Sequence, residues 1–138
     1  GGQLLIQPKV VDAGHHTRRL LRLTGLDVEE GQARRLLNDL DAFRAKKHPD
    51  ADEEIAAARW VTDVFDRITG AIPREFHGKL EPAQIVHEVL EHRWYISEAR
   101  GSNVPMEEAV ASYVDAVLRH RRDEARLVYG PEEQSTTT

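Results

Sequence analysis

Cysteine is absent from the 138-residue chain. The chain therefore forms no disulfide bond and offers no thiolate as a nucleophile or metal ligand. This absence is compatible with a reducing compartment, and we expect a cytoplasmic protein. No apolar run approaches the ~20 residues of a membrane span, and no signal peptide is visible. The chain opens with Gly1-Gly2-Gln3 instead of an initiator methionine, so we expect it to be a fragment of a longer protein.

The chain also lacks an excess of positive charge. Its formal net charge is -5 at pH 7, with 19 lysine and arginine residues against 24 aspartate and glutamate residues. Because contact with phosphates needs a basic face, this balance disfavours nucleic-acid binding through overall charge, although it leaves room for a local basic patch. Apolar residues make up 40% and charged residues 31%, which indicates a folded domain with one core.

Apolar residues recur at the i, i+3, i+4, i+7 spacing of amphipathic helices over most of the chain. Capping residues, glycines and prolines divide this pattern into five segments. The predicted helices cover about 13–23, 27–47 (with Asp27 and Glu30 as a capping box), 50–70, 82–100 and the segment from Pro105 onward. The first stretch, 4–11, is instead β-prone, and Pro8 confines it to a sheet edge.

The sequence therefore predicts an all-α fold, a bundle of about five amphipathic helices with a short N-terminal β segment. Residues 1–11 are predicted to be a strand or a linker arm. Residues 12–127 are predicted to form the helical domain. Residues 128–138, which end in Ser135 and three threonines, are predicted to be a flexible tail.

The segment HEVLEH, residues 87–92, carries two histidines and two glutamates on a predicted helix. In the metalloprotease motif the histidines are four residues apart, which brings both to one zinc ion. His87 and His92 are five apart, which leaves them about 140 degrees apart around the helix. We therefore expect no metal site, and we expect no cofactor.

The same segment instead gives two pairs at i, i+4 spacing, His87 with Glu91 and Glu88 with His92. A solvated helix face with weak pairs is the simplest interpretation. A ligand-binding or proton-transfer site is the alternative. Arg93 lies within the apolar arc of this helix, where a guanidinium is costly unless it is paired. We predict a carboxylate partner from another helix, the alternative being that only its aliphatic stem is buried.

The most basic stretch of the chain is HHTRR, residues 15–19. The glycine turn that follows is also similar to a helix-turn-helix. However, Glu29 and Glu30 would then face phosphate, and Gly31 stands where that motif usually carries an apolar residue. These features favour an ordinary αα-hairpin. The candidate basic patch comprises His15, His16, Arg18, Arg19, Arg22, Arg34 and Arg35.

No glycine-rich phosphate loop and no recognisable triad of serine, histidine and aspartate is present, so no catalytic residue is predicted. Trp60 and Trp94 lie near the edges of the apolar faces of their helices. We predict that both anchor the core. If either proved half-exposed, it would mark a partner surface.

Three segments carry a resemblance to a known family: GHHTRRLLRLTGLDVEEGQARRLLNDLDAFR (14–44), GKLEPAQIVHEVLEHRWYISEARG (78–101) and EEAVASYVDAVLRHRRDEARL (107–127). The chain resembles, over about 9–127, a C-terminal domain of unknown function found in bacterial, chiefly actinobacterial, proteins. In those proteins the domain follows a region similar to lipopolysaccharide kinases. Gly31 is a departure, since the family pattern has asparagine there in a QENQARRLLND-like run.

The resemblance implies a context rather than an activity. The acidic balance, the absence of catalytic motifs and the fragment character favour a non-catalytic accessory, regulatory or protein-interaction domain, and we expect no enzyme activity from this domain alone. Its partner would be the upstream kinase-like domain or another protein. Two alternatives stay open: nucleic-acid binding of the helix-turn-helix kind, and a ligand-binding or catalytic domain. The second would use the cluster of His87, Glu88, Glu91, His92 and Arg93.

Overall fold

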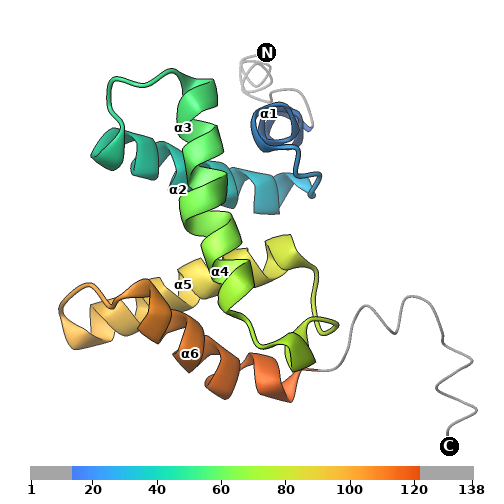
Figure 1. Cartoon of the computed structure of the whole chain (residues 1–138), viewed down its shortest axis with the longest axis vertical. Helices are drawn as coiled ribbons and strands as arrows, with labels where there is room; N and C mark the ends of the chain where they lie inside the picture. The colour runs from blue at the N-terminus through green and yellow to red at the C-terminus, as the bar shows by residue number, and fades with distance from the viewer. Residues whose placement is uncertain (1–13, 122–138) are drawn as a thin grey trace, which may run out of the picture. The chain divides into compact units, whose positions relative to one another are not determined.

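The computed structural model describes residues 14–121, and every regular element in that range is helical (Figure 1). The all-α prediction is therefore confirmed. The predicted β segment and the predicted tail lie outside the described residues. Backbone contacts divide the chain into two compact units, residues 1–61 and 62–138. The single helical domain expected over 12–127 stays a prediction.

The first unit contains α1 (His15–Thr24), α2 (Glu30–Lys47) and α3 (Glu53–Trp60). Each of these helices contacts the other two. Helix α2 carries an apolar stripe of Ala33, Leu36, Leu37, Leu40 and Phe43. All of these side chains are buried except Phe43, which is half-buried. Side chains from all three helices form the core of the unit. These are Leu20, Ala33, Leu36, Leu37, Leu40, Ala56, Ala57 and Trp60.

The turn between α1 and α2 explains why α1 ends where it does. Gly25 has a φ of 82°, and its N–H donates to the carbonyl of Leu21 at 2.8 Å. Only glycine adopts this left-handed conformation at low cost, so the residue is a helix stop. The hydroxyl of Thr24 donates to the carbonyl of Leu20 and accepts from the N–H of Leu26, which closes the turn.

The capping box expected from Asp27 and Glu30 does not form. Glu29 caps α2 instead, because its carboxylate accepts from the N–H groups of Gly31 at 2.8 Å and Gln32 at 2.9 Å. Glu30 turns to the other helix and accepts from the N–H groups of His16 and Thr17 at the start of α1. The two glutamates thus cap two different helices, and Glu30 holds the start of α1 against the start of α2.

The predicted third helix contains a change of helical type that the sequence analysis missed. The α-helical hydrogen-bond pattern of α3 stops at Trp60, a π-helical segment follows over Val61–Phe65, and α4 covers Asp66–Ala71. The start also differs, since Asp52 rather than Asp50 precedes the first turn. A π segment inserts an extra residue per turn, so a strict 3.6-residue pattern does not extend through it.

The second unit contains α4, the 3-10 turn Arg74–Phe76, α5 (Pro82–Arg100), α6 (Met106–Ala116) and the 3-10 turn Leu118–His120. Helices α5 and α6 form a hairpin, and α4 contacts both (Figure 1). The predicted limits of α5 are confirmed, with proline at its first position and Gly101 after its last residue. Buried side chains that face the core include Ile68, Val86, Val89, Val110, Tyr113 and Leu118.

We expect the stability of the first unit to depend on the ionised form of Glu30. Burial alone would raise the pKa of this carboxyl, but hydrogen bonds from Thr17 and His16 outweigh that effect and lower the pKa from 4.5 to about 2. Because the folded pKa is depressed, the stabilisation is complete above about pH 4.5 and is lost as the pH falls towards 2. Glu30→Gln should therefore lower the melting temperature at neutral pH, and the difference should shrink towards pH 2.

Thermal unfolding followed by circular dichroism across this pH range measures the effect. Asp50→Asn is the matched control, because Asp50 is an exposed carboxylate without a hydrogen bond or ion pair to any residue in 14–121. This variant should follow the wild type at every pH. A difference between wild type and Glu30→Gln that stays constant from neutral to acid pH would contradict the assignment.

Candidate functional site

A stripe of polar residues runs along one side of α5. Its members recur at three- and four-residue spacing, which places them on one helix face. Together with residues at and after the end of α6, they line an open pocket with a volume of about 270 Å³. The lining residues are Gln84, His87, Glu88, Glu91, His92, Tyr95, Tyr113, Val117 and Arg121.

Glu88 is the centre of the polar contacts in this pocket. Its side chain is only 13% exposed. One of its carboxylate oxygens accepts from the hydroxyl of Tyr113 at 2.7 Å, the other from the amide of Gln84 at 2.5 Å. The guanidinium of Arg121 lies 3.1 Å from both oxygens. A carboxylate this far from water needs such partners, so the network fixes α5 against the end of α6.

Tyr113 is held in its neutral form by this arrangement. Burial raises the pKa of its phenol well above the ordinary value of 10.0, and the hydrogen bond to Glu88 raises it further. The phenol therefore serves as a hydrogen-bond donor to a carboxylate rather than as a proton-transfer group near neutral pH.

The two histidines of the segment HEVLEH both line the pocket but make different contacts. Nε2 of His92 lies 2.8 Å from the hydroxyl of Ser112, and its ring meets the ring of Tyr113 edge-on. Nε2 of His87 lies 4.0 Å from a carboxylate oxygen of Glu91, which is a weak contact. Nδ1 of His87 is buried and has no hydrogen-bond partner among residues 14–121. The expected pairing of Glu88 with His92 is replaced by the contacts of Glu88 with Tyr113 and Arg121.

Metal binding finds no support in this geometry. Within the described range, no group of three or more histidine, aspartate or glutamate side chains is arranged to hold an ion. Both His87 and His92 line the pocket, but each has a different polar neighbour, Glu91 for His87 and Ser112 for His92.

Arg93 belongs to a different environment from the rest of the predicted cluster. It does not line the pocket. Its Nε donates to the backbone carbonyl of Val104 at 2.6 Å, rather than to the carboxylate that we expected. The charge of Arg93 nevertheless acts on Glu107. The pKa of Glu107 is lowered mainly by the hydrogen bond from Arg67, and the positive charge of Arg93 lowers it further. Arg93 therefore links α5 to the loop before α6.

The prediction that both tryptophans anchor the core is correct for Trp60 and wrong for Trp94. Trp60 is fully buried, and its indole N–H donates to Asp39 at 2.9 Å. Trp94 is 58% exposed and Tyr95 is 61% exposed. Trp94 lies five residues beyond the buried Val89, which turns it away from the apolar arc of α5. The rings of Trp94 and Tyr95 meet edge to face at 5.1 Å, so the two form an exposed aromatic pair.

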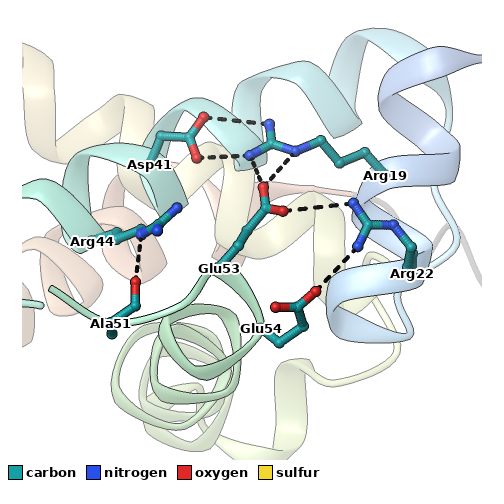
Figure 2. Close-up of polar contacts among 7 residues, drawn as sticks. All are labelled: Arg19, Arg22, Asp41, Arg44, Ala51, Glu53 and Glu54. Carbon is teal, nitrogen blue, oxygen red and sulfur yellow. Dashed lines mark hydrogen bonds and ion pairs between the residues drawn. The ribbon is translucent and has the colours of Figure 1, made fainter. Parts of the chain in front are cut away.

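Two members of the predicted basic patch, Arg19 and Arg22, belong to an ion-pair network in the first unit (Figure 2). Arg19 on α1 donates to Asp41 on α2 and to Glu53 on α3. The hydrogen bond to Asp41 is the largest cause of a raised pKa of Arg19, and the bond from Arg19 is the largest cause of a lowered pKa of Glu53. Arg19 thus ties three helices together.

The other members of that patch are partly engaged as well. Arg22 lies 3.6 Å from both Glu53 and Glu54, and the Glu30 carboxylate contacts the backbone and ring of His16. Arg18 and Arg35 also have interaction partners, the ring of His15 meets that of His16, and Arg34 is exposed. Of this patch, Arg19 is therefore closely paired with carboxylates, Arg22 is paired at longer range, and the patch as a phosphate-binding surface stays a prediction.

Several pocket residues were not singled out from the sequence. Gln84, Tyr95, Tyr113 and Arg121 line the pocket, although none of them is a candidate site residue in the sequence. The repeat of polar residues at 84, 87, 88, 91, 92 and 95 was a usable signal.

Fold and site together describe an all-α chain whose second unit carries a polar pocket and an exposed aromatic pair on α5. None of the helices within residues 14–121 is long and apolar enough to cross a membrane. The chain belongs to the family described as Domain of unknown function (DUF4032), whose model matches residues 1–118. No curated protein and no solved structure matches the chain.

We expect Arg19→Gln to destabilise the first unit by about 1–2 kcal/mol, because Glu53 would lose its main partner in a half-buried position. Arg22→Gln is the matched control, since Arg22 is 57% exposed and its contacts are long. It should cost less than about 0.5 kcal/mol. Urea unfolding of the two variants measures the difference, and equal losses would refute the special role of Arg19.

The state of Tyr113 can be tested by an alkaline titration. Because the pKa of its phenol is raised, Tyr113 should contribute no phenolate absorbance around pH 10. Tyr113→Phe should therefore leave the rise in phenolate absorbance around that pH unchanged. Circular dichroism at the same pH checks that both proteins stay folded. Loss of one tyrosine equivalent of absorbance in the variant would show that Tyr113 titrates normally.

Proposed function

We propose that this chain is a non-catalytic protein-interaction domain whose contact surface is centred on Trp94 and Tyr95. The observation that supports this proposal is the exposure of both rings, side by side on a well-formed helix. Large aromatic side chains are enriched in the energetically dominant positions of protein interfaces. Their exposure in the free domain leaves apolar area that a partner can bury.

The partner that we favour is a kinase-like region upstream in the same protein, or a separate protein. The support for a kinase-like partner is the resemblance described above, in which such a domain follows a region similar to lipopolysaccharide kinases. The domain would then have an accessory or regulatory role. The engagement of Arg19 and Arg22 with carboxylates supports this role over nucleic-acid binding.

Ligand binding or proton transfer in the pocket on α5 is the second candidate function. The pocket unites four members of the predicted cluster: His87, Glu88, Glu91 and His92. Glu88, however, is held by three donors, and Tyr113 is a poor proton-transfer group. The contact between His92 and Ser112 lies in the middle of α6, where the backbone N–H groups are used within the helix and cannot stabilise an oxyanion.

A binding titration tests the proposed function. The chain would be titrated against the rest of its parent protein, expressed separately, by calorimetry. Trp94→Ala with Tyr95→Ala should weaken binding by about tenfold or more, because truncation of an aromatic residue at the centre of an interface typically costs about 2 kcal/mol or more. Circular dichroism should show little change in folding, since both side chains are exposed.

Leu21→Ala with Ile55→Ala is the matched control. Both residues are exposed apolar side chains, 44% and 53% accessible, and they lie on α1 and α3. This double variant should bind as the wild type does. Equal affinity of the aromatic double variant and the wild type would exclude the Trp94–Tyr95 pair as the contact surface.

A further inference from the structure

We infer that the exposed aromatic pair, with Glu91 and Glu98, forms a recognition site for a cationic side chain, an arginine or lysine in a basic segment of the partner protein. This inference rests on the proposed function and adds the chemistry of the partner. It combines the placement of two carboxylates, the engagement of the nearby arginines, and the size of the pocket beside Tyr95.

The two carboxylates flank the aromatic pair along α5. Glu91 precedes Trp94 by three residues and Tyr95 by four, and Glu98 follows them by four and three. Residues at these spacings are neighbours on a helix surface, with about 5–6 Å between their Cβ atoms. Glu98 is exposed, and the side chain of Glu91 is 37% exposed. A cation above either ring would therefore have a carboxylate within reach.

Three arginines in the described part of this unit that contact α5 or extend from it are engaged with other acceptors. Arg93 donates to the carbonyl of Val104, Arg100 to Glu108, and Arg121 to Glu88. The hydrogen bond to Glu108 is the largest cause of the raised pKa of Arg100, which shows a close pairing. These guanidinium groups are used to join α5 to neighbouring segments. Among residues 14–121, these three arginines are therefore committed to contacts other than the aromatic pair.

The pocket gives this cation a place beside Tyr95 and Glu91, which both line it. Its volume of about 270 Å³ lies below the ~300–1,000 Å³ typical of sites for drug-sized ligands. A single long side chain is therefore a better match than a cofactor. The aliphatic stem would cover the Tyr95 ring, and the charged end would meet Glu91.

Arginine suits such a site better than lysine, because its planar guanidinium both stacks on rings and binds carboxylates through two donors. The same unit already contains one arrangement of this kind. Cζ of Arg119 lies 5.2 Å from the centre of the Phe76 ring. Recognition of a cation by an aromatic ring thus uses an interaction that this fold employs internally.

The experiment is a nuclear magnetic resonance titration of the whole chain with a synthetic nonapeptide of alternating arginine and glycine. The chain has two tryptophans, so its spectrum contains two indole N–H signals, and Trp94→Phe assigns them. The arginine peptide should shift the Trp94 signal in a saturable way and leave the signal of the buried Trp60 in place. A peptide with uncharged citrulline in place of arginine should shift neither signal.

Two double variants separate a specific site from general charge attraction. Glu91→Gln with Glu98→Gln should raise the Kd for the arginine peptide about fivefold or more. Asp63→Asn with Glu75→Gln changes the net charge of the same unit equally, on exposed residues outside α5, and should change the Kd by less than about twofold. Equal weakening by the two double variants would overturn the inference, as would an unshifted Trp94 signal at millimolar arginine peptide.

Two outcomes would refute recognition of a cation and leave the proposed contact surface in place. If the citrulline peptide shifted Trp94 as strongly as the arginine peptide, the aromatic pair would be an apolar contact surface and recognition of a cation would be refuted. Binding of the rest of the parent protein that depends on Trp94 and Tyr95, but not on Glu91 and Glu98, would also refute it while preserving the proposed function.

Discussion

The contact of Arg19 with Asp41 and Glu53 is the constraint on which the first unit depends, because it joins all three of its helices through one side chain. The second unit follows the same rule with other arginines. Arg121 holds Glu88 of α5, and Arg67 joins α4 to Glu107 of α6. With no cysteine and few aromatic residues, the chain relies on aliphatic packing for burial. Directional arginine contacts then add specificity to how its helices meet.

Arg19, which the sequence places in a candidate basic patch, instead joins three helices. What α5 presents to solvent is instead an aromatic pair with carboxylates on both sides. The polar pocket beside it is built around Glu88, whose three donors make it a fixed structural centre. Recognition of a partner therefore fits this surface better than acid–base chemistry does.

Local signals in the sequence were sufficient to predict that these segments are helical, but not every helix end or helical type. Pro82 and Gly101 determine the ends of α5 through backbone geometry alone, so its limits were predictable. The capping of α2 was not, because Glu29, Glu30 and Asp27 all have suitable side chains. Tertiary contact decides that Glu30 caps α1, fourteen residues away from His16. The π-helical segment after Trp60 also escaped prediction, since nothing in a 3.6-residue pattern marks an inserted residue.

The site was predictable only in part for a similar reason. His87 and His92 line the same pocket, and the absence of a shared metal ion, which their five-residue spacing indicates, stays a prediction. Two of the three partners of Glu88, Tyr113 and Arg121, lie 25 and 33 positions further along the chain, which no local pattern reveals. Trp94 was assigned to the core because it stands near the edge of the apolar arc. A shift of one helix position decides whether such a residue is buried or exposed.

Hydroxyl-radical footprinting with mass spectrometry is the most direct test of the central claim, that the aromatic pair on α5 is the open contact surface. In the free chain we expect rapid oxidation of Trp94 and Tyr95 and protection of Trp60 and Tyr113. Addition of the rest of the parent protein should protect Trp94 and Tyr95. Slow oxidation of Trp94 in the free chain, or unchanged oxidation in a complex shown to form, would contradict the account.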